Sequence, residues 1–263
     1  MLLVAVVVAW RAAQALPQAV AHASTSRPAR AAKASGAAPA SRAPVSFRAG
    51  ETLNYRVAWS MFSSAASVEL TVPEQRDLFG WKTWHFRAAA HTLSTVRSLF
   101  PVDDQFDSYS DATALTSRQY ELHLNELGRK EDQVLHLVTH GQQPRPPGAN
   151  VEVLLGTRDP LGALYALRDV DWQRIAEFRA PVYDGRDLYE MRATRESASE
   201  AITAAGGQLS ASRVAIRVFQ HDQEISAIRF AVWFSNDAAH APVVIQAQLP
   251  FGNLRAELTS ISR

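Results

Sequence analysis

Hydrophobic and polar residues alternate with a period of two along most of the chain after Val45. Buried-type positions alternate with polar or small ones in Leu53-Tyr55-Val57-Trp59, Val68-Leu70-Val72, Trp84-Phe86-Ala88-Ala90 and Ile228-Phe230-Val232-Phe234, and again in Val243-Ile245-Ala247-Leu249 and Leu254-Ala256-Leu258. Successive side chains of a β-strand point to opposite faces, so this pattern predicts strands with one buried face.

The residues between these runs favour turns. Asp184-Gly185 predicts a two-residue hairpin, Gly252-Asn253 offers a second, and Gly80, Gly128 and Gly206-Gly207 mark further breaks. The stretch 141–148 contains three prolines, which cannot donate to a ladder, and it predicts an exposed loop.

One segment has a helical pattern instead. Asp159 is suited to cap a helix, Pro160 follows at the first helical position, and Leu161, Leu164 and Tyr165 are spaced by three and four residues. Residues 93–100 offer a weaker second helix. The predicted fold class is therefore all-β: one long, strongly curved antiparallel sheet, open or closed into a barrel-like form, with about 11–12 strands in meander connections and one or two short helices.

The first 44 residues differ in composition from the rest. An apolar run, Leu2–Trp10, and an Ala21-His22-Ala23 cleavage pattern predict a signal peptide over residues 1–23, although no positive charge precedes the run. Residues 24–44 contain only Ala, Ser, Pro, Arg, Thr, Lys and Gly, which predicts a disordered linker. Residues 45–263 then form a single β domain, and the expected location is periplasmic or secreted, with no integral membrane span in the mature chain.

Charge and cysteine content exclude several function classes. Five of the 27 basic residues precede residue 45 and all 26 acidic residues lie at Glu51 or beyond, so the folded part carries about four net negative charges. It has no basic stripe of the kind that nucleic-acid binders need. The absence of cysteine excludes thiolate nucleophiles, cysteine-ligated zinc and disulfides.

A serine, an aspartate and a histidine, Ser235, Asp237 and His240, stand close together in the sequence. They lie between two predicted strands of a meander, where Asn and Asp side chains commonly satisfy turn amides, so a hairpin connection is favoured over a catalytic site. No G-x-S-x-G elbow occurs. We therefore predict no catalytic residues and a protein that is not an enzyme.

No metal site or cofactor is predicted. His136 and His140 fall on one strand, roughly 13 Å apart, which is too far to share an ion. The acidic stretch Asp103–Asp111 lacks the pattern of a calcium loop. Phosphate-binding glycine motifs are also missing.

Motifs in a fixed order resemble the bacterial exported "domain of unknown function 3108" family. They are Phe47, Gly50, Glu51, Leu53, Tyr55, Val57 and Trp59; Asp159, Leu161, Leu164, Tyr165, Leu167 and Arg168; Tyr183-Asp184-Gly185 with Leu188-Tyr189-Glu190; and Trp233, Ser235, Asp237, Pro242, Val243, Gly252 and Ala256-Glu257-Leu258. The resemblance implies an envelope location and this architecture, and it implies no reaction.

Both faces of the predicted sheet carry aromatic residues, because Trp59 is in phase with the apolar face of its strand and Trp233 is not. Either the helix or a bound apolar molecule must cover the second face. Tyr165, Arg168, Trp59 and Trp233 are accordingly the candidate ligand-binding residues; packing aromatics and a buried ion pair are the structural alternative.

Three functions remain open. The first is a non-enzymatic protein that binds an apolar or amphipathic envelope component, such as a lipid or acylated polymer. The second is a structural module with a fully packed core that binds an envelope protein, at strand edges and the loop near Arg145. A cell-wall hydrolase is the remote third.

Overall fold

The computed structural model describes residues 45–142, 146–250 and 252–263. The predicted signal peptide (1–23), linker (24–44) and Arg145 lie outside these residues. Within them, no helix has the length and apolar character needed to cross a bilayer.

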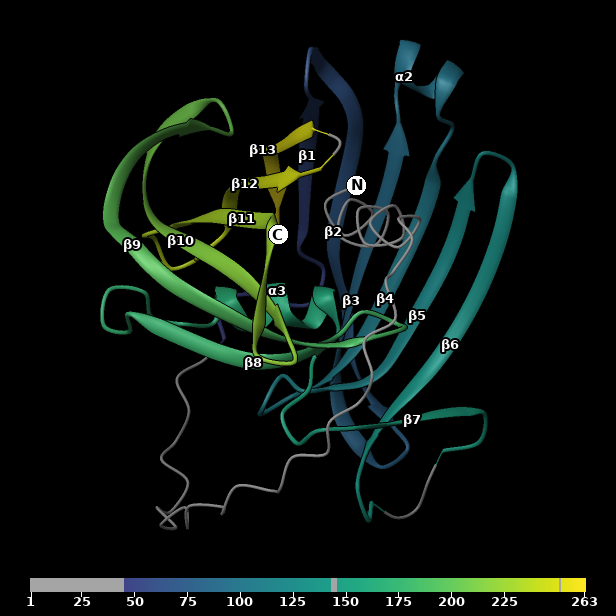
Figure 1. Ribbon diagram of the computed structural model, residues 1–263. Helices are drawn as coiled ribbons and strands as arrows, with labels where there is room; N and C mark the ends of the chain where they lie inside the picture. The colour runs from purple at the N-terminus through teal and green to yellow at the C-terminus, as the bar shows by residue number, and fades with distance from the viewer. Residues whose placement is uncertain (1–44, 143–145, 251) are drawn as a thin grey trace.

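A single sheet of 13 strands makes up most of the fold, and two short helices accompany it (Figure 1). The strands are β1 (Thr52–Trp59), β2 (Phe62–Leu78), β3 (Trp81–Thr92), β4 (Asp103–Asp111), β5 (Ser117–Glu126), β6 (Arg129–Thr139), β7 (Ala149–Val153), β8 (Glu177–Tyr183), β9 (Leu188–Ala204), β10 (Gly207–Gln220), β11 (Gln223–Ser235), β12 (Pro242–Leu249) and β13 (Gly252–Ser262). The helices are α2 (Ser94–Leu99) and α3 (Pro160–Arg168). The predicted all-β class is confirmed.

In the sheet, strands that follow each other in the chain lie next to each other, except β7 and β8, and the first strand pairs with the last. It runs β7-β6-β5-β4-β3-β2-β1-β13-β12-β11-β10-β9-β8, with β1 antiparallel to β13 in the middle. The pairing brings Thr52 opposite Ser262. The first half, β1–β7, and the second half, β8–β13, therefore curve toward each other from a common seam (Figure 1).

The free edges of the sheet, β7 and β8, approach each other through one short segment. Arg158 forms a parallel bridge with Val182, its amide donates to the Pro181 carbonyl, and the Tyr183 amide donates to the Arg158 carbonyl. The sheet is thus nearly closed into a barrel. Pro181 fits here because a proline is tolerated on an edge strand.

The connections depart from the predicted ones at three points. The structure has 13 strands instead of 11 or 12, and β7, only five residues long, pairs in parallel with β6. The Asp184-Gly185 hairpin has a four-residue loop, because the Asp184 side chain accepts from the Arg186 and Asp187 amides. Leu249 pairs with Gly252, so the last hairpin turns before Gly252-Asn253.

The core lies between the two halves, around α3. The buried face of β1 is Leu53, Tyr55 and Val57, as the alternation predicts. Every residue of α3 from Leu161 to Arg168 is buried, which is typical of a helix enclosed on all sides.

Candidate functional site

Helix α3 begins at a buried carboxylate that reaches into the sheet. Asp159 Oδ1 accepts from the amides of Leu161 and Gly162, and Oδ2 accepts from the Ser108 and Ser117 hydroxyls at 2.5 Å each. The side chain is fully buried, and burial raises the pKa of Asp159 although these hydrogen bonds act to lower it. Asp159 therefore fixes the start of the helix against β4 and β5.

Tyr165 fills the space between α3 and β3. Its ring stacks on Phe86 with 3.8 Å between centroids, and Phe47 meets it edge-on at 5.3 Å. Tyr165 is 2 % exposed. Its environment is an aromatic cluster of the protein's own side chains.

Arg168, at the end of α3, is bound on all sides. Its guanidinium makes a bidentate pair with Glu51 and donates from Nε and Nη2 to the carbonyl of Ala239, and both charged side chains are 1 % exposed. Arg263 reaches the same carboxylate at 3.2 Å. A buried pair of this kind holds α3, β1 and the β11–β12 connection in one arrangement.

The β11–β12 connection is the hairpin that the sequence predicts. The Ser235 hydroxyl donates to Asp237 at 2.7 Å and accepts from the Ala241 amide, and Asp237 also accepts from the Ala239 amide. These contacts set the loop that presents the Ala239 carbonyl to Arg168. The motif residues thus form two hydrogen-bonded groups, with Asp159 at the start of α3 and Glu51, Arg168, Ser235 and Asp237 at its end.

The two tryptophan candidates lie elsewhere. Trp59 meets Phe100 edge-on at 6.0 Å, beside α2, whereas the Trp233 indole donates to Glu200 at 2.7 Å and lies under Arg213. The structure brings Tyr165 and Arg168 together on one helix and places Trp59 and Trp233 at two other positions. The four do not surround a common space.

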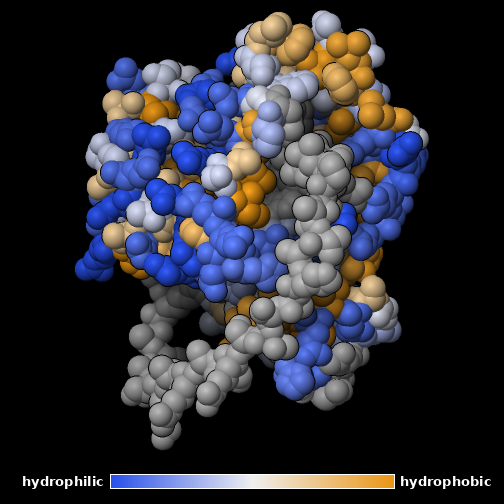
Figure 2. All heavy atoms as spheres, viewed as in Figure 1, coloured by the Kyte–Doolittle hydropathy of each residue, from blue (hydrophilic) through white to orange (hydrophobic). Residues whose placement is uncertain are grey.

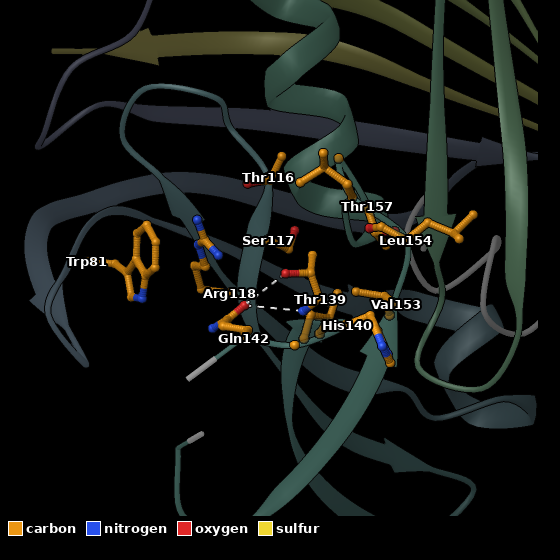
Figure 3. Close-up of a pocket in the computed structure, with 14 residues that line it drawn as sticks. Trp81, Thr116, Ser117, Arg118, Thr139, His140, Gln142, Val153, Leu154 and Thr157 are labelled. Atoms are coloured by element: carbon orange, nitrogen blue, oxygen red, sulfur yellow. Dashed lines mark hydrogen bonds between the residues drawn. The ribbon is translucent and has the colours of Figure 1, made fainter. Parts of the chain in front are cut away.

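A cleft of about 400 Å³ lies at the rim of the barrel-like sheet, next to the start of α3 (Figure 3). It is lined by the ends of β3, β5, β6 and β7 and by residues next to these strands in the chain. The lining residues are Trp81, Thr116, Ser117, Arg118, Leu137, Thr139, His140, Gly141, Gln142, Val153, Leu154, Leu155, Gly156 and Thr157.

The lining of this cleft is both apolar and cationic. The Arg118 guanidinium stacks 3.8 Å from the Trp81 ring centroid and pairs with Asp111 at 3.3 Å. Leu154 and Leu155 are 60 % and 89 % exposed at its edge. Such a surface suits a molecule with an apolar part and an anionic group.

A second group of exposed apolar side chains lies at the opposite end of the strands. Figure 2 shows them gathered at the top, over α2, and the exposed residues of this region are Met61, Leu99, Phe100 and Leu127. The Leu127 amide donates to the Pro101 carbonyl, next to α2.

The cleft was not predicted from the sequence. Its residues come from the ends of four strands, β3, β5, β6 and β7, and from the segments beside them, which are far apart along the chain. The closest sequence signal is the apolar pair Leu154-Leu155, which follows a strand and precedes the capped helix without belonging to either.

Comparison with known proteins identifies relatives of the fold. The family model described as "Protein of unknown function (DUF3108)" matches residues 54–259. A β-barrel-like protein of domain of unknown function DUF1849 from Brucella abortus has a TM-score of 0.52 at 11% identity, over 81% of this chain and 96% of its own. A protein of Parabacteroides distasonis, described as a predicted lipoprotein, gives 0.38 at 11% identity, over 82% and 96%. No curated protein matched.

Proposed function

The chain belongs to the DUF3108 family of proteins of unknown function. We propose that it is an exported, non-enzymatic protein that binds an amphipathic envelope component in the rim cleft. The bound molecule is a lipid or an acylated polymer with an anionic group. The observation that carries the proposal is the cleft of about 400 Å³ with Arg118 on one wall and Leu154 and Leu155 at its edge.

The size and lining of the cleft support a small-molecule ligand. Ligand pockets typically enclose about 300–1,000 Å³ and combine apolar walls with a few polar groups. Here the apolar lining includes Trp81, Leu137 and Val153, and four threonine and serine residues also line the cleft. An acyl chain would cover the leucines, which water otherwise contacts.

The arginine supports an anionic group on the ligand. Arg118 Nη2 donates to Asp111, whereas its buried Nε has no hydrogen-bond partner in the described chain. A guanidinium has five N–H donors in a fork that matches carboxylate and phosphate oxygens. A phosphate or carboxylate in the cleft would take donors that Asp111 leaves free.

The direct experiment is native mass spectrometry of the protein purified from its own envelope, with lipid extraction of the same sample. We expect a bound species of defined mass that carries an acyl chain. A protein that is consistently empty after gentle purification would contradict the proposal.

The cleft is tested by titration with lauroyl lysophosphatidylglycerol in a calorimeter. Replacing both edge leucines, Leu154→Asp and Leu155→Asp together, removes the apolar contact and is expected to weaken binding at least about tenfold, since a buried leucine contributes about 1.5–3 kcal/mol. The fold should be unaffected because both side chains are largely exposed.

The matched control replaces Met61→Asp and Leu127→Asp together. These side chains are 87 % and 61 % exposed, close to the values of Leu155 and Leu154, but they lie at the opposite end of the strands. Unchanged binding in the control supports the cleft. Equal weakening in both double variants would show that the probe adsorbs to exposed apolar surface in general.

A second candidate is a structural module that binds an envelope protein. It is favoured by the space between α3 and the sheet, which the protein's own side chains fill. Phe47, Phe86 and Tyr165 occupy the space between helix and sheet that an enclosed ligand would need. Cross-linking in intact cells distinguishes the two: recovery of one specific protein, together with an empty cleft, favours the module.

A further inference from the structure

A cluster of histidine and carboxylate side chains lies on the face of β4 and β5 that points away from the core. Asp107 of β4 lies directly opposite Glu121 on the adjacent strand β5, and His123 follows Glu121 by two residues on the same face. One ligand atom from each of the three residues lies within 4.8 Å of the other two. Their inward neighbours, Phe106 and Leu122, are buried in the core.

The orientation of His123 is fixed by a second carboxylate. Its Nδ1 lies 2.7 Å from Asp132 of β6, and its Nε2 lies 3.4 Å from Glu121. When Nδ1 carries the hydrogen that Asp132 accepts, Nε2 presents its lone pair toward Glu121. Metal-binding histidines are held in this way by a carboxylate on the other ring nitrogen.

Asp107 is held from the opposite side. Its Oδ1 accepts from His85 at 2.5 Å and from Arg87 at 2.7 Å, and its Oδ2 accepts from Gln105 at 2.6 Å. Burial raises the pKa of Asp107, but these three hydrogen bonds outweigh it and leave the pKa below its usual value. A carboxylate offers about four lone pairs, so one on Oδ2 remains for a further partner.

The charges in the cluster favour a cation. Asp107, Glu121 and Asp132 carry three negative charges, and Arg87 is the one arginine or lysine that the structure pairs with any of them in its described residues. The cluster opens to solvent on its β6 side, where Val134, opposite Glu121, is 42 % exposed and the Asp132 side chain is 76 % exposed. On the β3 side, the Asp107 side chain is 1 % exposed.

From this geometry we propose a binding site for a divalent transition-metal ion such as Zn²⁺, with Asp107 Oδ2, Glu121 Oε2 and His123 Nε2 as ligands and Asp132 as the residue that positions His123. Mixed imidazole and carboxylate donors suit Zn²⁺ and its neighbours, whereas Ca²⁺ and Mg²⁺ take oxygen donors. Ligand atoms on a tetrahedral zinc lie about 3.4 Å apart, so Glu121 and His123, both partly exposed, need only small rotations. Water would complete the coordination.

The site differs from the rim cleft in position and in ligand chemistry. It lies on the outer face of the sheet, and none of its ligands lines the cleft. Its three ligands come from two strands that pair across the sheet, and Asp132 comes from a third. For this reason the spacing of metal-binding residue types along any single strand does not indicate the site.

The test is calorimetric titration of the full-length protein with Zn²⁺, in buffer without chelator, with Ca²⁺ as the comparison ion. We expect one saturable Zn²⁺ site. His123→Ala or Glu121→Gln should abolish it, and Asp132→Asn should weaken it about 10–100-fold, as loss of a positioning carboxylate does elsewhere. Thermal unfolding with and without Zn²⁺ should show a stabilisation that disappears in the same variants.

The matched control is His91→Ala, which removes a histidine that also bonds an aspartate, Asp103 at 2.9 Å, on the same face of the sheet. Its Zn²⁺ affinity should equal that of the unmodified protein. Circular dichroism of each variant without metal checks the fold. The proposal is overturned if the unmodified protein binds no Zn²⁺, if His123→Ala binds as tightly as His91→Ala, or if Ca²⁺ binds as tightly as Zn²⁺.

Discussion

Gly162 shows how closely single residues are fitted where α3 meets the sheet. A Cβ atom at this position would lie 2.8 Å from the hydroxyl oxygens of Ser110 and Ser117 and 3.2 Å from Asp159 Oδ2. Both serine hydroxyls belong to the hydrogen-bonded group that includes Asp159 and Ser108. The absence of a side chain at residue 162 therefore allows the helix to approach β4 and β5.

Gly162→Ala should destabilise the protein, although alanine is favoured over glycine by about 1 kcal/mol in most helices. We expect a loss of about 1–3 kcal/mol, because overpacking displaces the serine hydroxyls that bond to Asp159. Urea unfolding of this variant and of Gly207→Ala measures the difference. Residue 207 has open space around it, and its replacement should change the unfolding free energy by less than about 0.5 kcal/mol.

The start of helix α3 can be predicted from the sequence, but the side chains that bond to its capping residue cannot. Asp159 and Pro160 carry a local signal that marks the start of a helix, and the predicted cap is confirmed. Its partners Ser108 and Ser117 lie more than 40 positions away in sequence, and no spacing rule points to them. The same limit applies to the cleft, whose walls meet only after the strands from β3 to β7 have paired.

At the scale of elements, the position of helix α3 depends on the buried ion pair between Arg168 and Glu51. Arg168→Gln leaves Glu51 buried with Arg263 as its remaining cation, and we expect a loss of about 3–5 kcal/mol in the free energy of unfolding. Arg174→Gln is the control, because its side chain is 86 % exposed and its pairing distance to Asp171 is 3.9 Å. Its effect should lie near zero.

Replacing both partners separates charge from packing. The double variant Arg168→Met with Glu51→Leu removes both charges of the pair, so neither is left buried without the other. It should recover much of the unfolding free energy that Arg168→Gln loses. Chemical denaturation of the three variants measures the recovery. If Arg168→Gln unfolds like the unmodified protein, the pair does not hold the helix.

Strands are predicted well where one face is buried, since the alternation of apolar and polar residues reports burial directly. The helix at α3, the shorter α2 and the β11–β12 hairpin follow from local patterns. The parallel pairing of β7 does not, because it depends on a partner reached through the proline-rich segment. The Asp184-Gly185 sequence predicts the position of the turn, but the loop has four residues instead of two, because the aspartate side chain satisfies two amides that a tighter turn would not present.

At the scale of the whole molecule, protection of backbone amides against hydrogen exchange should rise from the sheet edges toward the β1–β13 seam between the two halves. β7 has five residues and one neighbouring strand, whereas β1 and β13 each have two neighbours and a buried face. Hydrogen exchange followed by mass spectrometry should show β7 exchanging first and the β1–β13 pair last. Early exchange in β1 would mean that the halves open along their seam.

The pairing of the first and last strands also decides when a newly made chain can finish folding. Until β13 is available, β1 presents an unpaired edge, and such edges are prone to join other chains. Contacts between positions 52 and 262 span nearly the entire domain, so closing them is entropically expensive and slow. A chain that is still being made would accordingly keep this edge of β1 unpaired, and would need shielding from its neighbours, until β13 is available.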